Sequence, residues 1–272
     1  MNGLKDRYFT TGQHTLCYQY IQGKGLPLVF LHGGTGSLSV WYLSLSELKK
    51  SKRPILLIDL FGHGKSSISD DWHDYSLENH AQYILNLVAE LKITKFDLIG
   101  HCLGSMIASV IASKQPSLVR KLVLINPGGF NKSIYLSSFT VGIVRLLLPL
   151  IHLITDRIPR KKGRPDERKY IGNHELYIPR FLDEVRYCSY KTAVNQFIAF
   201  SKWNEAKYYP NIKAPTLVIS GVKDIIFSPK TTHKVVGLIP KLNHVQLPTN
   251  HLAPLNMSSE MTELINVFTN NE

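Results

Sequence analysis

Short apolar runs alternate with longer amphipathic segments along most of the chain. Each apolar run is bounded by polar or turn residues and predicts a β-strand. The predicted strands cover residues 14–21, 27–31, 54–59, 96–100, 121–126, 216–221 and 242–247. All but the first and the last are continuously apolar, which is typical of parallel strands covered on both faces.

The segments between the strands predict amphipathic helices. Residues 77–91 place six apolar side chains on one stripe, and Ser76 stands before them in the N-cap position. A second helix is predicted at 103–114, ending before Pro116, and a third at 260–268. Strands and helices in this order predict an α/β fold with a mostly parallel, doubly wound sheet.

One long interval breaks this alternation. From Phe130 to about Pro210 the chain contains helix-like stretches, prolines and charged residues but no convincing strand. We interpret residues 130–210 as a helical lid domain inserted before the last two strands. Residues 1–129 and 211–272 would then form the core domain.

The first part of this lid, Ile134–Ile154, is strongly apolar. Arg145, Pro149 and His152 interrupt it, so it falls short of the ~18 apolar residues expected of a membrane span. Two interpretations stay open. The apolar surface packs the lid against the core domain, or it lines a pocket for an apolar acyl group.

The formal net charge of +12 is concentrated in the lid. Residues 130–210 hold 14 Lys and Arg against 7 Asp and Glu, so +7 of the +12 lies there, most densely in Arg157–Lys169. This stretch is either a solvated surface or a docking site for an acidic carrier protein or an anionic membrane surface. Nothing resembles a nucleic-acid-binding motif, so we exclude a nucleic-acid partner.

The cysteine content and the N-terminus bear on the compartment. Cys17, Cys102 and Cys188 are widely spaced, with neither a disulfide nor a metal-binding pattern. The first residues show no apolar core of signal-peptide length. We therefore expect a reduced, cytoplasmic protein that uses no metal and no cofactor.

The sequence G-H-C-L-G, Gly100–Gly104, stands between a predicted strand and a predicted helix. A strand that turns sharply into a helix strains the turning residue and leaves room only for small residues two positions before and after it. The N-terminus of the helix would stabilise a thiolate and an adjacent oxyanion. This context favours Cys102 as a nucleophile over a buried structural cysteine.

A second glycine-rich stretch, L-H-G-G-T-G-S at Leu31–Ser37, follows the strand at 27–31. It lacks the spacing of a phosphate-binding P-loop or of a dinucleotide-binding loop. Glycines at the end of a strand leave backbone N–H groups accessible. With the turn at Cys102, the stretch fits an oxyanion hole formed by the backbone N–H groups of Gly34 and Leu103.

These two motifs, with D-L-F-G-H-G-K-S-S at 59–67, resemble the α/β-hydrolase family in the order in which that family carries them. The resemblance spans about Tyr18 to Phe268. It implies the α/β-hydrolase fold, a nucleophile at Cys102 and a structural turn at Asp59–Ser66, with no catalytic role for Asp59 or His63.

The resemblance also implies an acid after the strand that follows the lid and a histidine after the last strand. Asp224 and His251 occupy these positions, and Asn250 replaces the glycine usual before the histidine. His233 and His244 lie within a predicted helix and a predicted strand, where structural roles are expected. The other acid position found in such folds holds Asn126, which cannot carry the charge.

In this assignment His251 takes the proton of Cys102, and Asp224 fixes the tautomer of His251. Most members of the family have serine at the turn, so cysteine, which forms a thioester acyl-enzyme, points to a thioesterase, an acyltransferase or a cyclase. The sequence therefore predicts an enzyme that hydrolyses an ester or thioester or passes the acyl group on. Its substrate would be a small-molecule or carrier-bound acyl group with an apolar portion.

Two alternatives stay open. One is a non-catalytic ligand-binding or scaffold protein that retains the hydrolase fold. The other, ranked lower, is a peptidase similar to the proline iminopeptidases, which the H-G-G start of the glycine loop resembles. Those enzymes hold an amino terminus with acidic lid residues, whereas this lid is basic as a whole.

Overall fold

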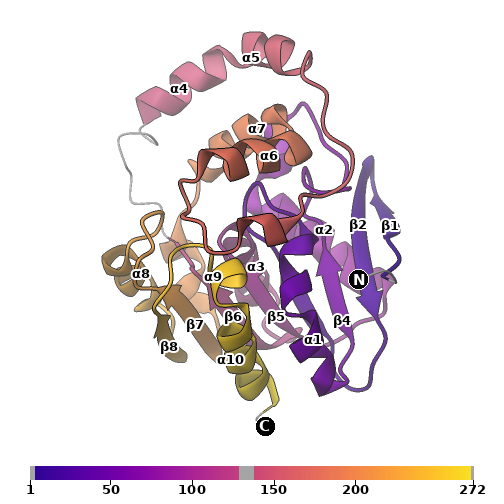
Figure 1. Ribbon diagram of the computed structural model, residues 1–272, viewed down its shortest axis with the longest axis vertical. Coiled ribbons are helices and arrows are strands. Elements are labelled where there is room, and N and C mark those ends of the chain that lie inside the picture. Colours follow the sequence, from indigo (N-terminus) through magenta and orange to yellow (C-terminus); the bar gives the residue numbers. More distant parts are fainter. Residues whose placement is uncertain (1–3, 129–137, 271–272) are drawn as a thin grey trace.

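The computed structural model describes residues 4–128 and 138–270. Its centre is one eight-stranded sheet in the order β1-β2-β4-β3-β5-β6-β7-β8 (Figure 1). The strands from β4 onward in this order pair in parallel, whereas β1 with β2 and β2 with β4 are antiparallel. The predicted α/β-hydrolase fold is confirmed.

Seven of the eight strands lie where the apolar runs predicted them. They are β2 (His14–Ile21), β3 (Leu28–Leu31), β4 (Ile55–Ile58), β5 (Phe96–His101), β6 (Val119–Ile125), β7 (Thr216–Gly221) and β8 (Leu242–Leu247). The sequence analysis missed β1 (Arg7–Thr11), an edge strand whose residues are mostly exposed. An edge strand buries too little of its surface to need an apolar pattern.

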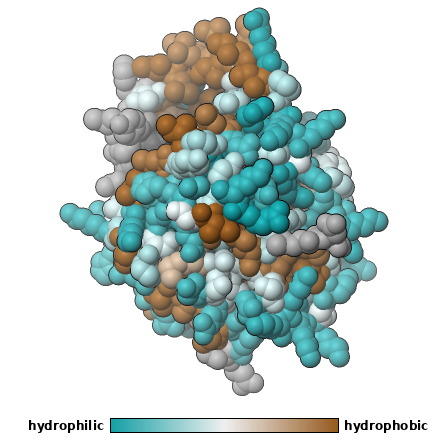
Figure 2. Space-filling model, viewed as in Figure 1, coloured by the Kyte–Doolittle hydropathy of each residue, from teal (hydrophilic) through white to brown (hydrophobic). Residues whose placement is uncertain are grey.

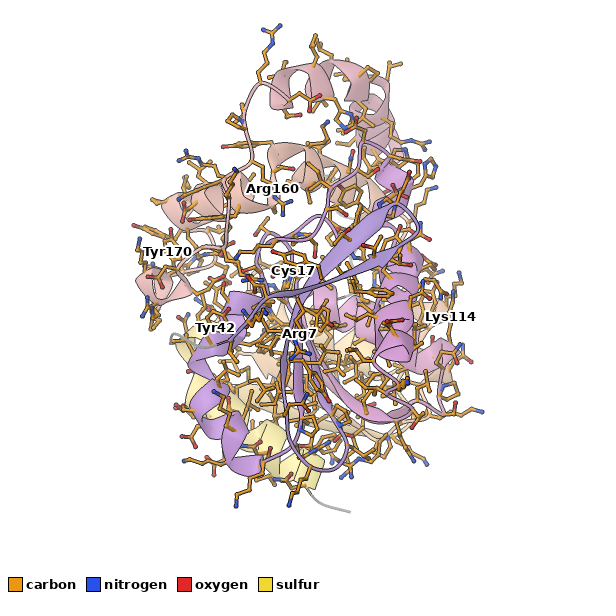
Figure 3. The ribbon with its side chains drawn as sticks, turned by 90° about the vertical axis from the view of Figure 1, so that its right-hand side faces the viewer. Arg7, Cys17, Tyr42, Lys114, Arg160 and Tyr170 are labelled. Atoms are coloured by element: carbon orange, nitrogen blue, oxygen red, sulfur yellow. The ribbon has the colours of Figure 1, made fainter. Side chains whose placement is uncertain are left out.

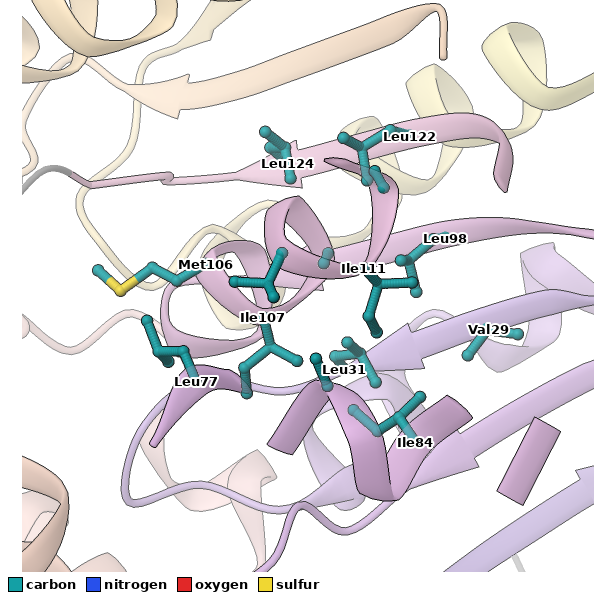
Figure 4. Close-up of a cluster of buried hydrophobic side chains, with 14 of the residues drawn as sticks. Val29, Leu31, Leu77, Ile84, Leu98, Met106, Ile107, Ile111, Leu122 and Leu124 are labelled. Carbon is teal, nitrogen blue, oxygen red and sulfur yellow. The ribbon is translucent and has the colours of Figure 1, made fainter. Parts of the chain in front are cut away.

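Helices cover both faces of the sheet, because side chains alternate between the faces along each strand. On one face Val29 and Leu31 of β3 pack in the same cluster as α2 (Leu77–Glu90) and α3 (Leu103–Lys114), as Figure 4 shows. On the other face Leu28 and Phe30 pack with side chains from α1 (Leu45–Leu48), α9 (Ala253–Asn256) and α10 (Ser258–Asn270). The predicted helices correspond to α2, α3 and α10, and Ser76 caps α2 by accepting from the N–H of Asn79.

Helices are inserted between β6 and β7, as predicted. They are α4 (Ser138–Leu146), α5 (Leu148–Thr155), α6 (Ile178–Cys188) and α7 (Tyr190–Phe200), with a short 3₁₀ helix, η5 (Glu167–Tyr170), between α5 and α6. Figure 1 shows them above the carboxyl ends of the parallel strands. Residues 130–137 of the predicted lid lie outside the described residues, and the domain boundaries at 130 and 210 stay a prediction.

Two arginines of the basic segment 157–169 anchor the lid to the core domain. Arg160 donates to the carbonyl oxygens of Gly64 and Ser66 at 2.6 and 2.8 Å, and Figure 3 shows it on the side of the molecule that holds Cys17. Arg164 donates to the buried carboxylate of Asp59 at 2.8 Å. The turn that begins at Asp59 is therefore structural, as the resemblance implied, and part of the basic segment is buried rather than exposed.

Candidate active site

Cys102 occupies a strained turn between β5 and α3. Its φ of 50° and ψ of −110° lie in a region that residues other than glycine rarely adopt. A side chain on Gly100 would overlap the carbonyl oxygen of Gly104, and one on Gly104 would overlap that of Leu31. The G-x-C-x-G spacing therefore has the steric cause that the sequence analysis inferred.

The structure brings Cys102, His251 and Asp224 together at the carboxyl end of the sheet. Nδ1 of His251 lies 2.8 Å from Oδ2 of Asp224, and His251 lines the same cavity as Cys102. Cys102 is partly exposed, whereas the other two side chains are buried. This is the arrangement in which a histidine can take a proton from the thiol while the carboxylate orients it.

The carboxylate of Asp224 is held by four hydrogen bonds. Oδ1 accepts from the backbone N–H groups of Ile226 and Phe227, and Oδ2 accepts from His251 and from Nδ2 of Asn126, all at 2.8 Å. These bonds outweigh burial and lower the pKa of Asp224. Asn126 thus has a supporting role that the sequence analysis did not assign, and its position directly after β6 was the available signal.

The neighbours of His251 favour its charged form. Burial alone lowers the pKa of this imidazole, but the charge of Cys102 and the hydrogen bonds with Asp224 and Cys102 raise it to about 10. A positively charged imidazole at this position would stabilise a negative charge that forms on the sulfur of Cys102.

The glycine loop approaches the turn closely. A Cβ added to Gly33 would lie 2.8 Å from Nδ1 of His101 and 3.3 Å from Cβ of Cys102. His32 fixes the loop, because its Nδ1 donates to the carbonyl oxygen of Gly33 at 2.7 Å and its Nε2 accepts from the N–H of Leu60 at 3.0 Å. Burial lowers the pKa of His32 to about 3, so this neutral tautomer is maintained.

The two predicted oxyanion-hole positions lie beside Cys102. A Cβ added to Gly34, which lines the cavity described below, would meet nothing within 4 Å. Leu103 is the first residue of α3, so no earlier turn of that helix supplies an acceptor for its N–H. Their assignment as oxyanion donors stays a prediction.

The remaining histidines and cysteines named by the sequence lie elsewhere. His233 lies in α8 (Pro229–Val236), and Nε2 of His244 in β8 lies 2.8 Å from Oγ of Ser220. Cys17 and Cys188 are buried, and burial raises the pKa of each to about 12. Of the three cysteines, only Cys102 lines the cavity.

A cavity of about 640 Å³ opens beside Cys102, His251 and Gly34. Its apolar wall comes from the lid and from the loops after β7 and β8, through Leu176, Ile178, Phe181, Phe200, Ile226, Phe227, Leu252, Pro254 and Leu255. No residue of α4 or α5 lines it. The described residues of the apolar stretch Ile134–Ile154, 138–154, do not line this cavity, so the acyl pocket beneath the lid that the sequence suggested stays a prediction.

The lid wall of the cavity is acidic, although the lid as a whole is basic. Glu167, Glu175 and Glu184 line it with a single arginine, Arg180, and all four are buried. Arg180 binds Oε1 of Glu184 at 2.5 Å, and Oγ1 of Thr35 donates to Oε2 of Glu184 at 2.8 Å. Burial, with the nearby charge of Glu184, raises the pKa of Glu167 well above its usual range.

Comparisons with known proteins agree with the fold. A family model described as alpha/beta hydrolase fold matches residues 27–172. The 1-acylglycerol-3-phosphate O-acyltransferase ABHD5 of Rattus norvegicus is 36% identical over 118 residues, which is 43% of this chain and 33% of that protein. The chain thus matches about a third of the length of this relative.

Two further similarities cover more of the chain. The (E)-2-((N-methylformamido)methylene)succinate hydrolase of Acinetobacter baylyi is 26% identical over 208 residues, 76% of each protein. The solved thioesterase domain from the curacin biosynthetic pathway superposes with a TM-score of 0.75 at 17% identity, covering 97% of this chain and 99% of that one. With the family model matching more than half of the 272 residues, the chain belongs to the α/β-hydrolase family.

Proposed function

We propose that the protein is an acyl-transfer enzyme that works through Cys102, His251 and Asp224 and a thioester acyl-enzyme. One observation carries the proposal. Cys102 holds the strained turn before α3 and lines one cavity with His251, which Asp224 binds at 2.8 Å. A scaffold protein would need none of these features, so they favour catalysis over the non-catalytic alternative.

In the proposed reaction His251 accepts the proton of Cys102, and the sulfur attacks the carbonyl carbon of an acyl donor. The carbonyl oxygen becomes an oxyanion, which the N–H groups of Gly34 and Leu103 stabilise. The bond to the leaving group then breaks, and His251 gives its proton to that group. A second nucleophile loses a proton to His251, attacks the thioester and releases the sulfur of Cys102 beside the protonated imidazole, which restores the starting state.

The substrate that we propose is an acyl compound with an apolar portion. The cavity of about 640 Å³ has a largely apolar wall and is large enough for a drug-sized molecule. The names of the acyltransferase and hydrolase relatives support acyl or lipid chemistry. The second nucleophile decides the outcome: water gives hydrolysis, whereas an alcohol, amine or thiol gives acyl transfer.

Turnover of matched esters and thioesters tests this proposal. Acyl p-nitrophenyl esters and acyl thioesters of increasing chain length should be turned over by the wild type, and Asp224→Asn should lower the rate by about 10²-fold or more. Adding hydroxylamine as the second nucleophile should divert the acyl group to a hydroxamate. Ligand binding without turnover, equal in the wild type and Asp224→Asn, would favour the scaffold alternative.

One observation favours a second candidate, the peptidase of the proline iminopeptidase type. The sequence argued against this candidate because the lid is basic as a whole. The lid wall of the cavity nevertheless carries Glu167, Glu175 and Glu184. An amino terminus bound there would be close to these carboxylates. Amino-acid arylamides test this candidate directly: release of the arylamine would favour it, and turnover of acyl esters alone would exclude it.

A docking role for residues 157–169 remains part of the proposal, in reduced form. Arg160 and Arg164 are engaged with the core domain, which leaves Arg157, Lys161, Lys162, Arg168 and Lys169 exposed. These five cations would be the ones available to an acidic carrier protein or an anionic membrane surface.

A further inference from the structure

Helices α4 and α5 are apolar on two sides. Their inner side packs against the core through Val141, which clusters with Trp72 and with Ile198 of α7. A second apolar stripe faces solvent, with Ile143 and Leu146 on α4, Leu147 between the two helices, and Leu150, Leu153 and Ile154 on α5. We call these six residues the outer apolar face.

The outer apolar face is unusually exposed. Its residues are between 41% and 80% accessible, with Leu146 the most exposed. The three on α5 stand at positions i, i+3 and i+4, the spacing that aligns side chains on one face of a helix, and Ile143 and Leu146 on α4 stand at i and i+3. Figure 2 shows hydrophobic side chains over α4 and α5 and again lower on the same side of the molecule. A soluble monomer seldom exposes such a contiguous patch without a partner.

The charges around this face indicate the kind of partner. Residues 127–155 contain no Asp or Glu. The guanidinium of Arg145 lies 4.8 Å from the ring centroid of Trp72 and is therefore turned toward the inner side. Asp156 directly after α5 is exposed but is paired with Lys191 at 2.5 Å. Arg157 and Lys162 follow it and are exposed. Contact between two copies through this face would place these cations near one another, whereas an anionic lipid surface would attract them.

The lengths of the helices indicate the mode of contact. Within residues 4–128 and 138–270, no helix is long and apolar enough to cross a membrane. Short helices with an apolar face and flanking cations instead lie in the headgroup region of a bilayer. The apolar side chains Leu176, Ile178 and Phe181, which line the cavity, are exposed as well.

We propose that α4 and α5 dock the protein on an anionic lipid bilayer, with the outer apolar face buried among the headgroups. Arg157 and Lys162 contact lipid phosphates. Docking of this kind does not depend on the acyl chemistry of Cys102, so either can fail while the other holds. Where both hold, the enzyme would take its acyl substrate from the lipid surface.

Vesicle flotation tests the proposal with the full-length protein. The wild type should float with vesicles of phosphatidylcholine and phosphatidylglycerol in equal parts. The triple variant Leu146→Glu, Leu150→Glu and Leu153→Glu should reduce the bound fraction at least tenfold. Val267→Glu, an equally apolar-to-acidic change at an exposed position of α10, is the matched control and should bind like the wild type.

Three further readouts decide between occupants. Arg157→Glu with Lys162→Glu should weaken flotation and its dependence on phosphatidylglycerol, and circular dichroism should show every variant folded. A wild type that does not float, or a triple variant that floats as well as Val267→Glu, overturns the proposal. The proposal is also overturned if light scattering shows that the wild type is a dimer and the triple variant a monomer, while neither protein binds vesicles. Flotation lost only in the charge variant would indicate a purely electrostatic surface and also contradict it.

Discussion

Ionisable side chains are buried both at the carboxyl ends of the strands, where Cys102, His251 and Asp224 lie, and in the lid wall of the cavity. We call the first region the sheet edge, and the two regions hold their side chains differently. At the sheet edge, both carboxylate oxygens of Asp224 are satisfied by core residues and loops next to the strands. In the lid wall, Oε2 of Glu175 has no hydrogen-bond donor, and Nε2 of His174 lies 3.5 Å from it. The comparison teaches that the sheet edge is fixed before substrate binds, whereas the lid wall retains polar groups that a substrate can engage.

The largest effect should come from removing the base at the sheet edge. His251→Ala should slow acylation of Cys102 by about 10³-fold, within the range typical of general acid–base catalysis. Stopped-flow release of p-nitrophenol measures this step. His244→Ala is the control, because His244 contacts Ser220 and not Cys102. Equal rates for His251→Ala and the wild type would show that the sheet edge is not catalytic.

The charge state of His251 provides a second test of the sheet edge. Its pKa is raised to about 10, so the imidazolium should persist through neutral pH and lose its proton only as the pH approaches 10. Cys102→Ala removes the charge that raises this pKa, while burial continues to lower it. NMR titration of the imidazole should therefore show a large downward shift in the variant. An unchanged titration would contradict this influence of Cys102 on the imidazole.

The anchorage of the lid to the core domain predicts a loss of stability. Arg164→Ala leaves Asp59 buried without its cation, which costs about 3–5 kcal/mol when a buried pair is broken. Arg168→Ala breaks only an exposed pair with Asp166, which water and salt screen, so it should cost far less than Arg164→Ala. Urea unfolding compares the two variants. Similar midpoints would mean that Arg164 does not anchor the lid.

The smallest effect should come from the contact that joins the lid wall to the glycine loop. Thr35 has a φ of 62°, and its hydroxyl donates to Glu184. Thr35→Val keeps the β-branched shape and removes the donor, so kcat/KM should fall by about fivefold, the worth of one hydrogen bond. Thr35→Ser should retain most of the activity. Equal losses in both variants would assign the effect to the backbone rather than to the hydrogen bond.

The sheet edge could be predicted from the sequence because local patterns determine it. Cys102, Asp224 and His251 each follow a strand, and strands of this sheet are continuous apolar runs bounded by turns. The small residues around Cys102 also carry their steric reason in the sequence. Only Asn126 was underestimated, because its role depends on a hydrogen bond to a residue 98 positions away.

The lid could be predicted only in outline. Its helical content and place before the last two strands were correct, but which side chains face the cavity depends on contacts across the chain. Thr35 meets Glu184 over 149 positions, and Asp59 meets Arg164 over 105. The average charge of the lid concealed an acidic inner wall for the same reason. The cytoplasmic location and the absence of a cofactor stay predictions from composition and motifs.

Intact-protein mass spectrometry after exposure to an activated acyl ester tests the central claim most directly. The account predicts one acyl adduct, located on Cys102 by peptide mapping, with Cys17 and Cys188 unmodified because both are buried. Cys102→Ala should carry no adduct. If several acyl donors leave the wild type unmodified, or if Cys102→Ala acquires the same adduct, Cys102 is not the nucleophile.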